Sequence, residues 1–154
     1  MKFIDNIDPG NIKLGLEGQR KDEVIEELVE LLVESCNVSD SDTILNAVLS
    51  REREGSTGLE KGVAIPHAKS DAVNKLCIAI GISKDGIDFE ALDGKPSQLF
   101  FLMVAPTGES GPHVQAIAKI VKMIKIDRFR SKLLKAKQPQ EVIDAIVSAE
   151  NGEM

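Results

Sequence analysis

The sequence predicts an α/β fold, a three-layer sandwich in which a central mixed β-sheet is flanked by helices. Helical periodicity comes first along the chain, apolar strand-like runs cluster in the middle, and helical periodicity returns toward the C-terminus. The chain has 154 residues, of which 42% are hydrophobic and 29% charged. This length suits one domain with a sizeable core, so we expect residues 1–154 to form a single domain.

The N-terminal part predicts one weak strand and two helices. Residues 3–16 alternate weakly and suit a short edge strand. Residues 22–36 place their apolar side chains on one helical stripe and their glutamates on the other face. Ser41 or Asp42 can cap a second helix, which Gly55 ends.

The middle of the chain predicts the sheet. Residues 63–65 form a short apolar run that Pro66 ends. Residues 76–82 are apolar at nearly every position, as expected of an internal strand. A turn signal, Lys-Asp-Gly, and a short apolar run follow at 84–89. Residues 99–105, LFFLMVA, are the most apolar run and predict a central strand.

Three helices are expected after the last strand. A loop with Pro and Gly delivers His113 to the start of the first of them. Its predicted buried stripe is Val114, Ile117, Ala118, Val121 and Ile124. Residues 127–137 and 139–149 predict the other two.

Composition excludes several classes of function. A net charge of −6, with no Trp and no Tyr, argues against a nucleic-acid partner. The sequence has no run of roughly 18 apolar residues for membrane insertion and no signal-peptide pattern at its start. We therefore expect a cytoplasmic protein. Cys36 and Cys77 lie 41 positions apart and are expected to be free thiols rather than a disulfide. The two histidines have no metal-ligand spacing, so no metal site is expected.

The segment 51–68, REREGSTGLEKGVAIPHA, leads to one histidine, His67. Pro66 ends the strand before it, so His67 is expected in a loop at the end of the sheet. Glycines in this segment suit a backbone that passes close to a ligand. From residue type and position alone, a structural histidine remains the alternative.

The other candidate residues also have two interpretations. Arg51 can be a C-terminal helix charge or a salt-bridge partner of a neighbouring glutamate. His113 can be an exposed helix-start residue, and Ser56 and Thr57 can serve turn or capping chemistry. If the fold pairs His67 with His113, then His113, Arg51, Ser56 and Thr57 are candidates to surround the oxygens of a phosphoryl group on His67.

The whole pattern resembles a known family. The Arg-Glu pair, the Ser-Thr-Gly step, the Gly-x-Ala-x-Pro-His-Ala ending and the second histidine strongly resemble the IIA domain of the fructose/mannitol class of the bacterial sugar phosphotransferase system. Nitrogen-regulatory IIA proteins belong to the same family. The resemblance extends from about Asp22 to about Ala149 and implies the same α/β sandwich.

The resemblance also implies a function. His67 would accept a phosphoryl group from the phosphocarrier protein HPr and pass it to a IIB domain, with only an indirect link to a membrane IIC permease. His113 would stabilise phosphohistidine and Arg51 would face it, while no cofactor would be needed. The family usually has Leu where this chain has Val114, a conservative departure. We also expect apolar residues beside His67, such as Ile65 and Ala68, to take part in small transient interfaces.

Two other functions remain as alternatives. One is a nitrogen-regulatory-type IIA protein, whose phosphorylation state controls partner proteins. The other is a small hydrolase with His67 as general base, although no Ser or Cys nucleophile stands in a recognisable elbow.

Overall fold

The computed structural model describes residues 2–154 and has a five-stranded mixed sheet at its centre. The long strands β4 (Cys77–Ile87) and β5 (Ser97–Ala105) are antiparallel. The short strand β1 (Ile12–Lys13) runs parallel to β4. On the other side of β5, two short strands, β2 (Val63–Ala64) and β3 (His67–Lys69), pair with it in succession, both parallel to it.

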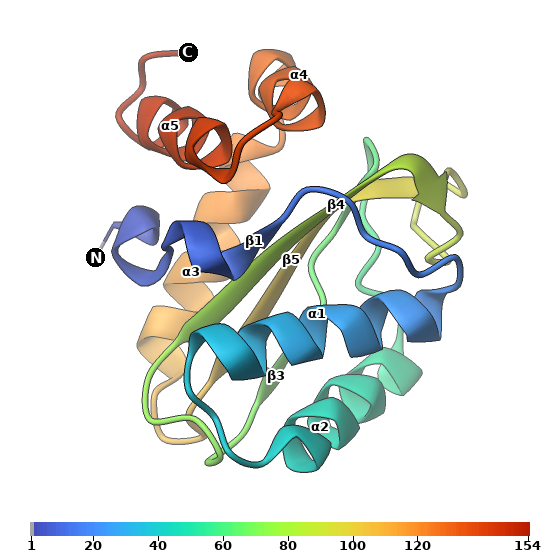
Figure 1. Cartoon of the computed structure of the whole chain (residues 1–154), viewed down its shortest axis with the longest axis vertical. Helices are drawn as coiled ribbons and strands as arrows, with labels where there is room; N and C mark the ends of the chain where they lie inside the picture. The colour runs from blue at the N-terminus through green and yellow to red at the C-terminus, as the bar shows by residue number, and fades with distance from the viewer. Residues whose placement is uncertain (1) are drawn as a thin grey trace.

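Helices cover both faces of this sheet (Figure 1). Helices α1 (Lys21–Ser35) and α2 (Ser41–Glu54) pack on one face. Helices α3 (Ser110–Met123), α4 (Asp127–Lys135) and α5 (Pro139–Glu150) pack on the other, together with the 3-10 helices η1 (Phe3–Asn6) and η2 (Pro9–Asn11). The predicted three-layer α/β sandwich is thus confirmed.

The alternation of side chains along β5 divides the core in two. Successive strand residues point to opposite faces, and both faces are covered, so nearly every position is apolar. The residues that face α3, α4 and α5 are Leu99, Phe101, Met103 and Ala105, whereas Phe100, Leu102 and Val104 face α1 and α2. The run LFFLMVA is therefore a buried central strand, as predicted.

The predicted turn at residues 84–86 is wrong. Strand β4 continues through this segment to Ile87, and a bulge shifts its register against β5 between Ile82 and Ile87. Gly86 takes the left-handed φ of +82° that the irregular backbone needs there. The Lys-Asp-Gly signal thus marks a bulge, and residue 87 belongs to the same strand.

Two helix details also differ from the prediction. The N-cap of α2 is Asp40, whose carboxylate accepts a hydrogen bond from the backbone N–H of Thr43. The buried face of α3 is centred on His113, Ala116, Ile120 and Met123, so the helix is rotated relative to the predicted stripe. Of that stripe, Ile124 is buried and Ile117 and Val121 pack against the core as partly buried residues, whereas Val114 is exposed.

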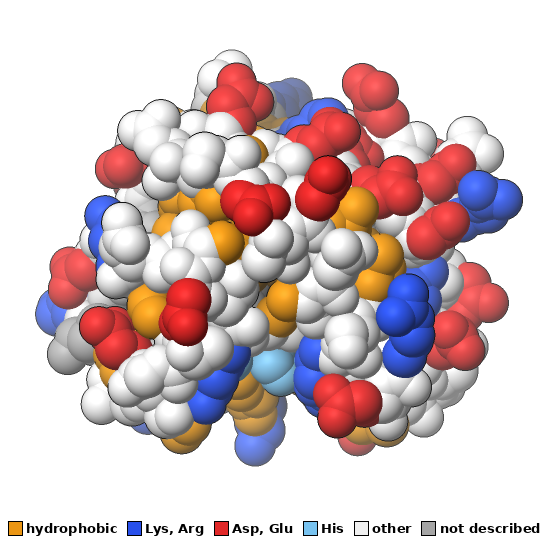
Figure 2. Space-filling view, turned by 90° about the horizontal axis from the view of Figure 1, so that it is seen from below, with side chains coloured by type: hydrophobic (Ala, Val, Ile, Leu, Met, Phe, Trp, Pro, Cys, Tyr) orange, Lys and Arg blue, Asp and Glu red, His pale blue; other side chains and the backbone are white. Residues whose placement is uncertain are grey.

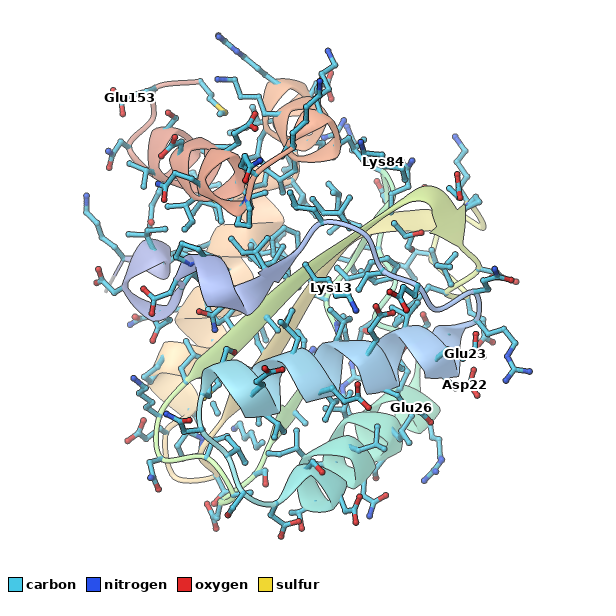
Figure 3. All side chains as sticks on the ribbon, in the orientation of Figure 1. Lys13, Asp22, Glu23, Glu26, Lys84 and Glu153 are labelled. Atoms are coloured by element: carbon cyan, nitrogen blue, oxygen red, sulfur yellow. The ribbon has the colours of Figure 1, made fainter. Side chains whose placement is uncertain are left out.

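An ion pair at the surface joins the sheet to one helix layer. Lys13 of β1 lies beside α1 (Figure 3), and its Nζ is 2.6 Å from a carboxylate oxygen of Glu27. Glu27 also accepts backbone N–H groups from Glu17 and Gly18, which fixes the segment between β1 and α1. Within residues 2–154, none of the helices has the length and apolar character needed to cross a bilayer.

Candidate functional site

His67 lies at the edge of the sheet, where Pro66 interrupts the pairing with β5. Proline has no N–H to donate, so β2 ends before it and β3 begins directly after it at His67, opposite Met103. The Pro66 carbonyl still accepts a bond of 3.1 Å from the Met103 N–H. His67 therefore opens a short strand instead of standing in a loop as predicted, and its backbone is held by the central strand.

One ring nitrogen of His67 is fixed by the backbone. Its Nδ1 lies 2.8 Å from the carbonyl oxygen of Ile65. A carbonyl oxygen can only accept a hydrogen bond, so Nδ1 carries the ring proton. The lone pair of the neutral imidazole is then on Nε2.

His113 lies next to His67, although the two residues are 46 positions apart in the sequence. It is in the first turn of α3, and its ring meets that of His67 edge-on, with centroids 5.4 Å apart and planes at 74°. The residue is only 5% exposed, so the alternative of an exposed helix-start histidine is wrong. Its Nε2 is buried and has no hydrogen-bond partner within residues 2–154.

The environment of His113 keeps its ring neutral. Burial lowers the pKa of His113 to about 4, and the electrostatic influence of His67 and Lys69 acts in the same direction. At neutral pH the ring therefore has one N–H and one lone pair. With that proton on Nε2, His113 would offer an anion on the neighbouring ring a donor that has no competing partner within residues 2–154.

The two histidines share an open cleft of about 440 Å³ with residues of α2 and β3. The other residues that line it are Ala47, Ser50, Arg51, Glu54, Ala68 and Lys69. In the space-filling view, a histidine is visible in a hollow between Lys and Arg side chains (Figure 2). The structure thus brings together three of the five predicted site residues, His67, His113 and Arg51.

Two cations border this cleft. The Arg51 Nη1 donates a 2.9 Å hydrogen bond to the carbonyl of Gly55, so Arg51 closes the C-terminus of α2 and lines the cleft as well. The Lys69 Nζ donates to the Ser110 hydroxyl at 2.8 Å. Sequence reasoning missed Lys69 because residues 69–75 looked like a polar link. Strand alternation was the available signal, since residues 67 and 69 share a face.

Ser56 and Thr57 make other contacts and do not line the cleft. The Ser56 hydroxyl donates to the carbonyl of Phe89 at 2.7 Å and accepts from the Gly58 N–H. The Thr57 hydroxyl and N–H both donate to the carboxylate of Glu52, at 2.6 and 2.8 Å. These contacts are of the turn and capping kind, which was the alternative interpretation of Ser56 and Thr57.

The contacts of Thr57 lead back to His67. The Thr57 carbonyl accepts the Ile65 N–H at 3.0 Å, and the Ile65 carbonyl accepts the His67 Nδ1–H. At the other end, Glu52 is 8% exposed and pairs with the Lys21 Nζ at 2.9 Å. Glu52 is thus a buried anchor for the backbone that orients the histidine ring, a role that sequence reasoning did not assign.

The surface beside the cleft differs from the expectation. Ile65 and Ala68 are buried, at 6% and 5% exposure, so neither offers apolar surface to a partner. Val114, expected in the core of α3, is 62% exposed and directly follows His113. Across residues 2–154, no group of three or more His, Cys, Asp or Glu side chains is placed to hold a metal ion.

Comparison with known sequences gives a consistent result. The family model for the phosphoenolpyruvate-dependent sugar phosphotransferase system, EIIA 2, matches residues 5–149. The chain is 40% identical over 126 residues to the fructose-specific EIIA component of Haloferax volcanii, covering 82% of each protein. It is 37% identical to the fructose-specific EIIABC component of Bacillus subtilis, but spans only 23% of the length of that protein.

Solved structures show the same architecture. The nitrogen regulatory protein IIA-Ntr from Neisseria meningitidis superimposes with a TM-score of 0.86 at 28% identity, over 93% of this chain and 97% of that one. The IIA mannitol enzyme of Escherichia coli, solved in complex with phosphorylated IIB mannitol, superimposes with a TM-score of 0.79 over 92% of this chain and 97% of that one. At 22% identity, this likeness shows the fold alone. Together with the family match over residues 5–149, these findings establish that the chain belongs to the EIIA 2 family of the sugar phosphotransferase system.

Proposed function

We propose that this protein is a phosphoryl carrier in which Nε2 of His67 accepts a phosphoryl group from phospho-HPr and passes it to a IIB domain. The observation that carries the proposal is the pairing of the two rings: the proton of His67 is held on Nδ1 by Ile65, and the buried His113 stands 5.4 Å away. The carrier would act in the cytoplasm, linked to a IIC permease only through IIB.

The transfer needs only the histidine as nucleophile. The Nε2 lone pair forms a bond to phosphorus while the bond from phosphorus to the nitrogen of the donor histidine breaks, and the electron pair stays with the donor ring. Because Nδ1 keeps its proton, the phosphorylated ring carries positive charge, which the Ile65 carbonyl stabilises. The ring then leaves as neutral imidazole when the group is passed on.

The neighbours of His67 suit the charge of a phosphoryl group. His113 can donate its N–H, and Arg51 and Lys69 line the same cleft with their positive charges. Ser56 and Thr57 remain predicted phosphate ligands, but their hydroxyls already donate to Phe89 and Glu52. We therefore assign the main stabilisation to His113 and the two cations.

Labelling with phosphoenolpyruvate, enzyme I and HPr tests the proposal. We expect one phosphate per chain, labile in acid and stable in base, and no label on His67→Ala. His113→Gln should still accept phosphate, but with a shorter-lived phospho-form or slower transfer to IIB. Since the chain has two histidines, the double variant is the matched control for non-histidine labelling. Full labelling of His67→Ala would refute the proposal.

A nitrogen-regulatory role is the second candidate, favoured by the likeness to the Neisseria meningitidis IIA-Ntr protein. It would use His67 in the same way but control partner proteins through the phosphorylation state. Mixing the phosphorylated protein with a fructose-type IIB domain separates the two. Rapid transfer supports the carrier, which the 40% identity to a fructose-specific EIIA component favours. Phosphate that stays on His67 supports the regulatory role.

A further inference from the structure

The fold brings the only two cysteines of the chain together. Cys36 is the C-cap residue of α1 and is half-buried, whereas Cys77 is the first residue of β4 and is 3% exposed. Both are free thiols, as expected, and they lie close enough together for each to shift the pKa of the other.

A buried side chain holds the two cysteine-bearing segments in place. The amide of Asn11 donates to the Ser35 hydroxyl at 3.0 Å and to the Ile78 carbonyl at 2.9 Å. These are the residues next to Cys36 and Cys77, and Asn11 itself is 5% exposed. The end of α1 and the start of β4 are therefore clamped together independently of any bond between the sulfurs.

We propose that Cys36 and Cys77 form a redox modification site, which a peroxide closes to an intramolecular disulfide. Disulfide formation requires two sulfurs near each other on backbones that do not have to move far. The Asn11 amide meets this requirement, because one nitrogen bonds both the residue before Cys36 and the residue after Cys77. The site uses no residue of the histidine cleft and does not rest on the proposed function.

The two thiols have different reactivities. The neighbouring Cys77 lowers the pKa of Cys36 to about 7, aided by Ser35 and the charge of Lys75 against the effect of burial. In turn Cys36, together with burial, raises the pKa of Cys77. Cys36 is thus the partly exposed sulfur that ionises near neutral pH and attacks first, and Cys77 is the buried resolving thiol.

The chemistry balances with hydrogen peroxide as the oxidant. The Cys36 thiolate attacks one peroxide oxygen, the O–O bond breaks, and the hydroxide that leaves takes a proton to become water. The Cys36 sulfenic acid is then attacked by the Cys77 sulfur, and a second water leaves. The two thiols lose two protons and two electrons, which reduce one peroxide to two waters.

The disulfide would enclose in one covalent loop a segment that contributes to the histidine cleft. The loop between Cys36 and Cys77 contains α2, β2 and β3, and therefore both Arg51 and His67. A crosslink across some 41 residues restricts the unfolded chain and should raise the Tm by roughly 10 °C. Dithiothreitol should reverse this rise.

Peroxide treatment of the reduced full-length protein tests the site. We expect a mass loss of two hydrogen atoms, a Cys36–Cys77 linked peptide on non-reducing digestion, and the higher Tm. The reaction should be about tenfold faster in native protein than in urea-unfolded protein, because only the fold places the thiols together. A peptide with one free cysteine, oxidised in parallel, confirms that the peroxide dose is sufficient.

Single variants separate the roles of the two thiols. Cys77→Ser should accumulate a sulfenic acid on Cys36 that dimedone traps, and Cys36→Ser should leave Cys77 unmodified at the same dose. Free thiols in the treated wild type, over-oxidation of Cys36 without a crosslink, or crosslinking only between chains would each overturn the proposal. The peptide map of the wild type decides the matter even if a variant does not fold.

Discussion

The neutral state of the buried His113 has a measurable consequence for stability. The pKa of its ring is about 4 in the folded protein, against 6.5 when unfolded, chiefly because of burial. A group whose folded pKa is depressed stabilises the protein above its unfolded pKa, and this stability is lost as the pH falls toward the folded pKa. The loss should therefore begin near pH 6.5 and be complete near pH 4.

The size of the effect follows from the shift in pKa. Roughly 3 kcal/mol would be lost in total, since each unit corresponds to about 1.4 kcal/mol. Between pH 7 and pH 5 alone, the free energy of unfolding should fall by about 2 kcal/mol. The carboxyl groups with perturbed values, such as Glu27 and Glu150, have lowered pKa values and contribute only below about pH 4.5. Between pH 7 and pH 5, the change in the free energy of unfolding thus reports mainly on His113.

Urea unfolding at pH 7, 6 and 5 measures this loss, with His113→Gln as the matched control. The variant cannot gain a proton in this range, so its free energy of unfolding should change by less than about 0.5 kcal/mol. NMR titration adds a direct reading, because the chain has two histidines and His67→Gln assigns the remaining signal. Titration of the His113 ring near pH 6.5, or the same pH dependence in His113→Gln, would refute the reasoning.

Three further substitutions test the packing and the surface. Thr57→Val should cost about 1–3 kcal/mol in urea unfolding, because it leaves an oxygen of the buried Glu52 without its donor; an unchanged midpoint would contradict the anchoring role. Gly81→Val should cost about 1–3 kcal/mol, since a Cβ there meets two leucine side chains at 2.8 Å, whereas Gly10→Ala meets nothing within 4 Å and should be nearly neutral. Val114→Asp should leave stability unchanged yet raise the KM for phospho-HPr several-fold, because this exposed apolar side chain follows His113, beside which the donor must dock; an unaltered KM would mean that HPr does not contact Val114.

The elements with strong periodicity could be predicted from the sequence, whereas their local irregularities could not. The run at 99–105 and the amphipathic helices follow from hydrophobic pattern alone. The Lys-Asp-Gly segment satisfies turn chemistry and bulge chemistry equally, so only the pairing with β5 decides that β4 continues to Ile87. The rotation of α3 was missed because a hydropathy pattern places Val114 inside and gives no reason to bury a histidine in its place.

The candidate site, too, could be predicted from the sequence only in part. His67 could be found because Pro66 marks the interruption of a strand, a signal within a few residues. The partners of His67 come from α2, β3 and α3, and the contact between Glu52 and Thr57 and the proximity of Cys36 to Cys77 exist only once these elements pack. Side-chain type suggests that such residues can bond, but the choice of partner is a property of the tertiary fold.

The charges around His67 fit the proposed carrier role better than they would fit a permanent phosphate site. The positive side chains that line the cleft, Arg51 and Lys69, are partly exposed, and both already donate hydrogen bonds within the protein. The second ring, His113, is neutral because burial and its neighbours lower its pKa. A cleft with more buried and fully charged donors would bind the phosphorylated state more tightly, and that added ground-state stability would raise the barrier to passing the group on. In the proposed carrier, modest stabilisation by one buried neutral donor, the half-buried Arg51 and the exposed Lys69 would leave the phosphoryl group transferable in both directions.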